Sequence, residues 1–283
     1  MSQTDKTPTS FRAACVQLRS GRERDANLDE AERLIRDAAR DGAVYIQTPE
    51  QTATMEMNRK ALMAVIGDEA DDLGVKRMQA LAEELKVWLH IGSMSFAVQS
   101  GDETKAANRS LLIAPNGEIA ARYDKIHMFD VDLENGESYR ESASFEAGGR
   151  AVAAALPWGT LGLTICYDLR FPYLYRALAQ QKGADILAIP SAFTKRTGEA
   201  HWHVLLRARA IEHGAFVLAA AQGGTHENGR KTYGHSLIID PWGRILAEAG
   251  DEPCFIAADI DMGLVAESRR SVPSLKHDKA FEF

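Results

Sequence analysis

The sequence of 283 residues is poor in cysteine and has no long apolar run, and both shortages restrict what the protein can be. It contains only three cysteines, without paired spacing, which argues against a disulfide framework and favours reduced thiols in the cytoplasm. No apolar stretch approaches the roughly 18 residues that a membrane span needs. The polar segment 1–10 lacks the apolar core of a secretory signal. We expect this segment to be a disordered tail and the protein to be cytoplasmic, without a membrane partner.

An excess of positive charge is also missing. The net charge is -7 at pH 7, and the basic residues are scattered rather than gathered in a stripe with aromatic residues. Such a distribution argues against a nucleic-acid partner. The hydrophobic fraction of 45% and the charged fraction of 26% are typical of a soluble globular enzyme.

Several common functional motifs are absent. The chain has no G-x-S-x-G elbow, no P-loop and no G-x-G-x-x-G after a strand. No set of Cys or His residues has the spacing of a zinc site, and His201 and His203 should diverge on a predicted helix. We therefore expect neither a metal site nor a cofactor.

Apolar segments with strand and helix patterns alternate along the chain. Strands are predicted at 11–18, 44–46, 87–91, 110–114, 119–123, 161–166, 184–189, 216–221 and 236–240, and helices at 27–39, 75–85, 172–181 and 199–213. In the first helix, Asn27 is the predicted N-cap and Glu30 occupies the capping-box position. The pattern predicts an α/β fold with a mixed sheet or two stacked sheets covered by helices, in a single domain over 11–283.

One cysteine stands where chemistry is possible. Cys166 ends a buried strand, and a polar turn and a helix follow it, which places the thiol for nucleophilic attack. The alternative is a packing role, as we expect for Cys15 in its apolar run. Cys254 is given no role.

A thiol needs a base or a nearby positive charge to become a nucleophile. No histidine forms an obvious partner motif, but Glu50 and Lys125 each follow a predicted strand. Taken singly, they could be a turn carboxylate and a solvated ammonium. If the three strand ends meet, Glu50 can take the proton of Cys166 and Lys125 can stabilise an oxyanion.

Three segments together resemble the nitrilase superfamily of carbon–nitrogen hydrolases. They are 48–50 (Thr-Pro-Glu), 123–132 (Tyr-Asp-Lys-Ile-His-Met-Phe-Asp-Val-Asp) and 165–172 (Ile-Cys-Tyr-Asp-Leu-Arg-Phe-Pro). The resemblance extends from residue 11 to about residue 273. It implies that Glu50, Lys125 and Cys166 form the catalytic triad and that Glu141 lies beside it. It also implies a four-layer α-β-β-α sandwich that associates as a homodimer or larger homo-oligomer.

Downstream segments resemble the Nit branch of this superfamily. They are 190–194, 197–202, 205–212, 219–222 and 233–236, and they are closest to deaminated-glutathione amidases. His203 departs from the pattern, because this branch usually has Glu there. If that Glu supports the pocket wall, the resemblance indicates the substrate preference less firmly than it indicates the triad.

The resemblance implies hydrolysis of a small, carboxylate-bearing linear amide through a Cys166 thioester, with release of ammonia or an amine. A backbone N–H, that of Tyr167, would assist Lys125 at the oxyanion, and Phe193 and His201 are candidates for the pocket wall. Within the same chemistry, the alternatives are an ω-amidase acting on 2-oxoglutaramate, a carbamoylase and a nitrilase. A non-catalytic scaffold and a metal hydrolase are the alternatives from other classes.

Overall fold

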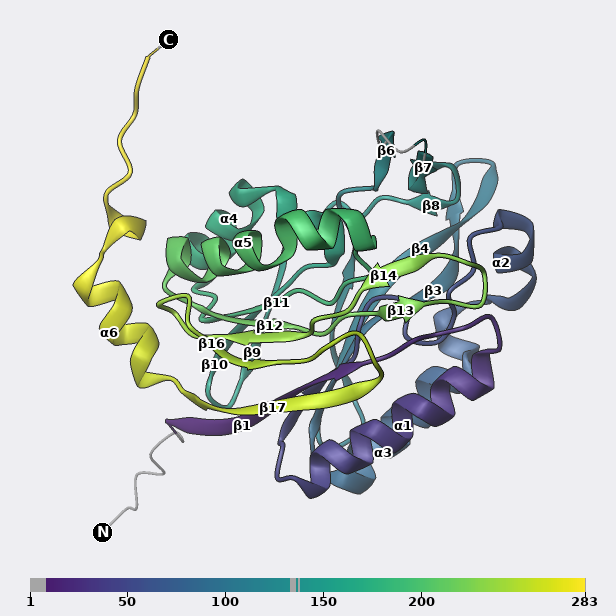
Figure 1. Cartoon of the computed structure of the whole chain (residues 1–283), viewed down its shortest axis with the longest axis horizontal. Coiled ribbons are helices and arrows are strands. Elements are labelled where there is room, and N and C mark those ends of the chain that lie inside the picture. Colours follow the sequence, from purple (N-terminus) through teal and green to yellow (C-terminus); the bar gives the residue numbers. More distant parts are fainter. Residues whose placement is uncertain (1–8, 133–135, 137, 283) are drawn as a thin grey trace.

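The computed structural model describes residues 9–132, 136 and 138–282. Two β-sheets face each other, and helices cover the outer face of each sheet (Figure 1). This is the four-layer α-β-β-α sandwich that the resemblance to the nitrilase superfamily implies.

The first sheet has the strand order β17-β1-β2-β3-β4-β5, with β8 paired to β4. Its strands are β1 (Ser10–Gln17), β2 (Tyr45–Gln47), β3 (Trp88–Ser100), β4 (Glu103–Ile113), β5 (Ile119–Asp124), β8 (Phe145–Glu146) and β17 (Cys254–Asp261). β1, β2 and β3 run parallel, while β4 and β5, which cover the predicted strands 110–114 and 119–123, form an antiparallel hairpin. The carboxyl ends of the parallel strands therefore lie at one edge.

The second sheet has the order β16-β15-β12-β11-β10-β9. Its strands are β9 (Val152–Leu156), β10 (Gly159–Leu163), β11 (Ile186–Ala188), β12 (Phe216–Ala219), β15 (Leu237–Ile239) and β16 (Ile245–Glu248). The central strands β10, β11 and β12 are parallel. Two small ribbons lie outside the sheets, β6 (Asp130–Asp132) with β7 (Ser138–Arg140), and β13 (Gly223–Thr225) with β14 (Lys231–Tyr233).

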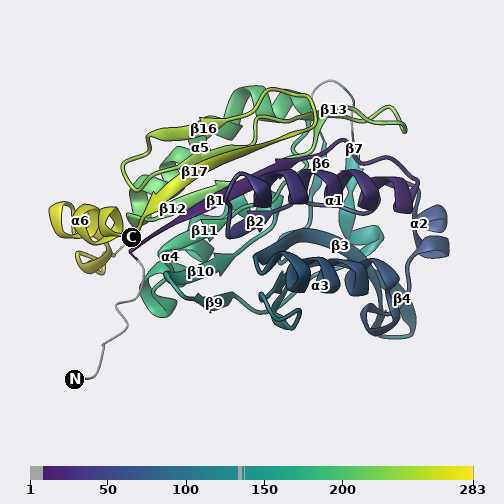
Figure 2. The same ribbon diagram turned by 90° about the horizontal axis from the view of Figure 1, so that it is seen from below.

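Helices α1 (Arg24–Arg40) and α3 (Leu73–Leu85) cover the first sheet, as Figure 2 shows from below. Helices α4 (Pro172–Lys182) and α5 (Lys195–His213) cover the second. Two shorter helices are α2 (Arg59–Val65) and α6 (Gly263–Ser271), and 3-10 turns occupy Glu69–Asp71, Glu141–Ala143, Cys166–Arg170 and Ser274–Lys276. No helix of the described chain is both long enough and apolar enough to cross a membrane.

The predicted start of the first helix was wrong. The helix begins at Arg24, so Asn27 lies inside it, and the residue before the helix, Glu23, makes no side-chain cap. The Asn27 side chain instead accepts from the backbone N–H of Gly21 and donates to its carbonyl, so it does not form a capping box with Glu30. A tertiary contact with the loop before the helix has replaced the local cap.

Two apolar cores fill the layers. The apolar face of α1, with α3 and one face of the first sheet, makes one core, in which the α1 residues Leu28, Ala31, Leu34, Ile35 and Ala38 are buried. The other lies between the sheets and beneath α4 and α5. Cys15 is fully buried in this second core, and all three cysteines are free. The first eight residues of the predicted tail lie outside the described residues, and β1 begins at Ser10.

Candidate active site

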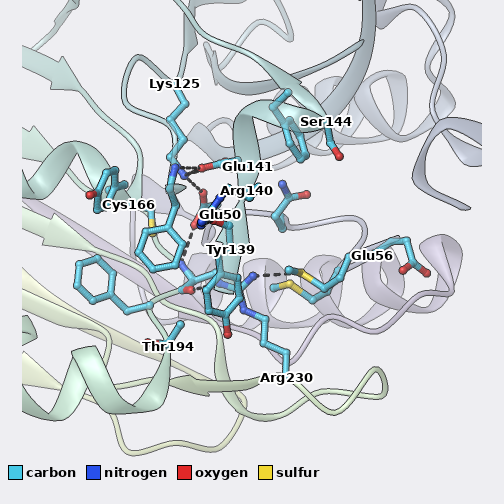
Figure 3. A pocket seen from close by; sticks show the side chains of 18 of the residues that line it. Glu50, Glu56, Lys125, Tyr139, Arg140, Glu141, Ser144, Cys166, Thr194 and Arg230 are labelled. Carbon is cyan, nitrogen blue, oxygen red and sulfur yellow. Dashed lines mark hydrogen bonds and ion pairs between the residues drawn. The ribbon is translucent and has the colours of Figure 1, made fainter. Parts of the chain in front are cut away.

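Three strand ends meet in one pocket of about 350 Å³. Glu50 follows β2, Lys125 follows β5, and Cys166 follows β10. All three side chains line the pocket together with Glu141, as Figure 3 shows. The structure thus brings together the four residues that the sequence predicts for the reaction.

The Lys125 ammonium lies between two carboxylates. Its Nζ is 2.9 Å from Oε1 of Glu50 and 2.9 Å from both oxygens of Glu141. Burial would lower the pKa of Lys125, but the charges of Glu141 and Glu50 raise it well above its ordinary value. Burial would raise the pKa of Glu50, but Lys125 and the hydrogen bond from Cys166 hold it below its ordinary value. Both groups are therefore ionised at neutral pH.

Asn108 on β4 also holds this cluster, and sequence reasoning missed it. Its Nδ2 donates to Oε1 of Glu50 at 2.9 Å and to Oε1 of Glu141 at 3.2 Å. A backbone donor, the Ala192 N–H, reaches the other oxygen of Glu50, Oε2, at 2.9 Å. Glu50 therefore has one oxygen, Oε1, that binds Lys125 and Asn108, and a second, Oε2, that accepts from the Ala192 N–H.

Cys166 stands on a strained turn rather than on a strand. β10 ends at Leu163, and Cys166 begins a 3-10 turn with a φ of 51°, in the left-handed region that side chains rarely adopt. The Cys166 N–H donates to the carbonyl of Pro190 at 2.9 Å, which fixes this backbone conformation. The strand prediction therefore extended too far, and the tight turn aims the thiol into the pocket.

Asp168 connects the turn of the nucleophile to the segment of Lys125. Its Oδ2 accepts from the Ile165 N–H at 2.9 Å and from the Tyr123 hydroxyl at 2.6 Å. Its Oδ1 accepts from the backbone N–H of His127 at 3.1 Å and lies 2.6 Å from His127 Nδ1. This one carboxylate binds residues on both sides of Lys125 to the residue before Cys166.

The Cys166 thiol is neutral in the resting protein. Burial raises its pKa above the ordinary value and the charge of Glu50 raises it further, while Lys125 has a smaller, lowering effect. A thiol of this kind reacts only when a base removes its proton during the attack. Glu50 is placed for that task, since its carboxylate carries the hydrogen bond of Cys166.

The structure places two of the three predicted wall residues in the pocket lining. Tyr167 and Phe193 line the pocket, whereas His201 does not. His201 is exposed, and its Nδ1 is 3.2 Å from Nη1 of Arg170, which does line the pocket. His203 is also outside the pocket-lining residues, so the departure from the branch pattern lies away from the wall.

Four arginines line the pocket, and the sequence indicated none of them as part of it: Arg59, Arg140, Arg170 and Arg230. Two of them have carboxylate partners, since Arg59 pairs with Glu103 and Arg140 with Asp132. The ion pairs of the described residues include no carboxylate partner for Arg170 or Arg230. The pocket therefore offers two cations that are free to meet an anion.

One group of ligating side chains lies elsewhere. Among the described residues, His203, His235 and Glu248 have possible metal-ligand atoms within 4.8 Å of one another. The two imidazoles lie 2.9 and 3.0 Å from the same oxygen of Glu248. These contacts satisfy the carboxylate without a metal ion, and none of the three residues lines the pocket.

Comparison with known proteins agrees with this site. The model of the carbon-nitrogen hydrolase family matches residues 12–270. Proteins named deaminated glutathione amidase are similar over most of the chain. The protein of Synechocystis is 44% identical over 94% of this chain and 97% of its own length. The protein of Homo sapiens is 37% identical over 93% of this chain and 81% of its own length.

Solved structures show the same fold. The NitFhit protein of C. elegans has a TM-score of 0.87 and 33% identity over 96% of this chain, which spans only 65% of the NitFhit chain. Nit3 of Saccharomyces cerevisiae, described as a member of branch 10 of the nitrilase superfamily, has a TM-score of 0.83 and 26% identity, with 96% and 98% covered.

The sandwich fold and the amidase-named relatives define a hydrolase that acts on carbon–nitrogen bonds in linear amides. The chain belongs to the carbon-nitrogen hydrolase family of the nitrilase superfamily.

Proposed function

We propose that the protein is a thiol amidase that hydrolyses deaminated glutathione, with Cys166 as nucleophile. The observation that carries the chemistry is the buried Glu50–Lys125–Glu141 cluster beside the thiol in one pocket. A scaffold protein would have no use for such a cluster, because buried charges are costly to maintain.

Acylation begins when Glu50 takes the proton of Cys166 as the sulfur bonds to the amide carbon. The carbonyl becomes an oxyanion, which the Lys125 ammonium and the N–H of Tyr167 stabilise. The oxyanion then collapses, the carbon–nitrogen bond breaks, and Glu50 returns the proton to the leaving nitrogen. The acyl group is now held on Cys166 as a thioester.

Water hydrolyses the thioester in the second half of the reaction. Glu50 takes a proton from the water as the oxygen bonds to the thioester carbon, and the thiol regains that proton as it leaves. Glu141 keeps Lys125 in place through two contacts of 2.9 Å. Every proton transfer is accounted for by side chains of this chain, so the proposal needs no metal or organic cofactor.

The proposed substrate rests on the relatives and on the charge of the pocket. Deaminated glutathione has a 2-oxo acid carboxylate at one end and a glycine carboxylate at the other. The relatives named for it cover most of the chain. Arg170 and Arg230 supply two cations in the pocket without carboxylate partners among the described residues.

The test is a comparison of kcat/KM across amides. We expect deaminated glutathione to be hydrolysed with a higher kcat/KM than 2-oxoglutaramate, and carbamoyl compounds and nitriles to be poor substrates. A higher kcat/KM for 2-oxoglutaramate would favour the ω-amidase function instead. Activity that survives a chelator would exclude the metal hydrolase.

We further propose that the protein is a homo-oligomer that uses the outer face of α5. Large apolar side chains are exposed on α5 and on the neighbouring turn and strand: Val204, Ile211, Trp242, Ile245 and Leu246. Arg207 of α5 donates to the carbonyl of Gly243 at 2.8 Å, which holds that turn against the helix. Light scattering should show a dimer or larger assembly, and Ile211→Glu should shift it towards the monomer.

The remaining expectations are one domain over 11–283 and a cytoplasmic location. The core that the two sheets share supports the single domain. The three free cysteines are consistent with a reducing compartment. Cooperative unfolding in one transition and fractionation of the cell would test them.

A further inference from the structure

Arg230 is an incompletely paired cation of the pocket. Its Nη2 donates to the carbonyl of Ala192 at 2.7 Å, and its Nη1 has only the weak acceptor Sδ of Met57 at 3.3 Å. Its Nε is buried and has no hydrogen-bond partner. A guanidinium offers five donors in a planar fork that matches a carboxylate, and leaving such donors unpaired in a buried position is costly.

The carboxylates that line the same pocket are already occupied. Glu50 and Glu141 bind Lys125, and Glu56 pairs with Arg22 at 3.2 Å. The Arg230 guanidinium also lies over the ring of Tyr139, 5.6 Å from its centre. The aromatic ring on one side strengthens the attraction to an anion by excluding water from that face. The anion that this cation can bind is therefore one that the substrate brings.

The position of Arg230 indicates which end of the substrate that anion occupies. Ala192 donates its N–H to Oε2 of Glu50, and its carbonyl accepts from Arg230. Oε1 of Glu50 is occupied by Lys125 and Asn108, so Oε2 is the oxygen that can pass a proton to the leaving nitrogen. Ala192 thus lies between Arg230 and Oε2 of Glu50, the oxygen on the leaving-group side.

Arg170 has other neighbours in the same pocket. Its guanidinium lies 5.9 Å from the ring centre of Tyr167 and 5.3 Å from that of Phe193. Tyr167 directly follows the nucleophile, and Phe193 directly follows Ala192. Arg170 is thus a second cation of the pocket, with aromatic neighbours that differ from those of Arg230.

We propose that Arg230 binds a carboxylate carried by the leaving group, which in deaminated glutathione is that of the terminal glycine. The inference rests on the proposed function and adds a specificity-determining residue to it. The leaving group is then a dipeptide, and two extended residues span about 7 Å, which suits an anchor beyond Glu50 rather than beside the reacting carbon.

The experiment compares two substrates that differ only at this carboxylate. They are deaminated glutathione and its analogue with glycinamide as the terminal residue. We expect the unmodified protein to prefer the carboxylate by about 10- to 100-fold in kcat/KM. In Arg230→Met this preference should fall to less than about twofold, and Arg230→Lys should restore part of it.

The controls separate binding from other effects. Lys231→Met removes an exposed cation from the next residue of the same hairpin and should keep the full preference. Arg230 also helps to lower the pKa of Glu50, so Arg230→Met should change the rate for every amide by one common factor. That factor is measured with 2-oxoglutaramate, which has no carboxylate on its leaving group, and it cancels in the ratio of the two main substrates.

Two outcomes would overturn the inference. One is an Arg230→Met protein that keeps the preference for the carboxylate, and the other is an unmodified protein that has none. If the unmodified protein hydrolyses 2-oxoglutaramate but not deaminated glutathione, the proposed substrate fails separately. Calorimetry then decides on Arg230: Cys166→Ala should bind deaminated glutathione more tightly than the glycinamide analogue, and adding Arg230→Met should abolish the difference.

Discussion

The hydroxyl of Tyr123 donates to Oδ2 of Asp168 at 2.6 Å, and this contact joins the strand that leads to Lys125 to the turn that carries Cys166. Both oxygens of Asp168 accept from this pair of segments. The oxyanion donor and the nucleophile come from different sheets, so their relative position depends on this buried carboxylate.

Asp168→Asn should therefore lower both stability and activity. The substitution replaces one carboxylate oxygen by an amide nitrogen, which cannot accept a hydrogen bond. The buried N–H or O–H groups that donate to that oxygen would then have no partner. We expect a loss of about 2–4 kcal/mol in the free energy of unfolding, measured in urea, and a lower kcat. Asp102→Asn, in an exposed turn, is the control. Full stability of Asp168→Asn would contradict the role of Asp168.

Lys125→Met should remove the oxyanion donor. We expect kcat to fall by about 100- to 1000-fold. The change also leaves Glu50 and Glu141 facing each other without the intervening cation, which should cost about 3–5 kcal/mol of stability. Lys105→Met is the matched control, because its ion pair with Glu146 is 3.7 Å long and lies at the surface. An active Lys125→Met protein would exclude the proposed role.

Gly92 sets the distance between Glu50 and Cys166. A Cβ at this position would lie 2.1 Å from the carbonyl oxygen of Thr48 and 2.5 Å from the Cβ of Pro190. Thr48 lies two residues before Glu50, and the carbonyl of Pro190 accepts from the Cys166 N–H. Gly92→Ala should cost about 1–3 kcal/mol and reduce kcat/KM. Gly67→Ala, where a Cβ meets nothing within 4 Å, should change neither.

The pH dependence of activity follows from three groups. Lys125 holds the pKa of Glu50 below its ordinary 4.5, so kcat/KM should be level at neutral pH and fall only as pH drops through that lowered value. Burial raises the pKa of Cys166, so its alkylation by iodoacetamide should accelerate only at a pH above the ordinary 9.0. Fast alkylation at neutral pH would indicate a resting thiolate and contradict this account.

The same ion cluster sets a window of stability. The pKa of Glu50 is lowered on folding, so its contribution is present above pH 4.5 and is lost as pH falls through the lowered value. The pKa of Lys125 is raised, so its contribution is present below pH 10.5 and is lost as pH rises through the raised value. Between these limits, the urea midpoint should not depend on this cluster.

Apolar periodicity predicted most strands of the two sheets and the four longest helices, because it is a local property. The strand ends left the meeting of Glu50, Lys125 and Cys166 as a condition, and the resemblance to the nitrilase superfamily implied it. Asn108 escaped prediction because a polar residue within a strand has no local pattern that points to a distant carboxylate. Arg230 lies beside a hairpin turn, where a charged residue is expected on solubility grounds alone. The helix start failed for a related reason, since Asn27 serves a tertiary contact with Gly21.

The central claim is that Cys166 attacks the amide carbon. As a first check, Cys166→Ala should keep its far-UV spectrum and lose activity by about 10⁴-fold or more. The most direct measurement is mass spectrometry of the protein during turnover of a slow amide. We predict an acyl group on the peptide that contains Cys166; an adduct on Cys15 or Cys254 alone, or none during turnover, would contradict the thioester mechanism.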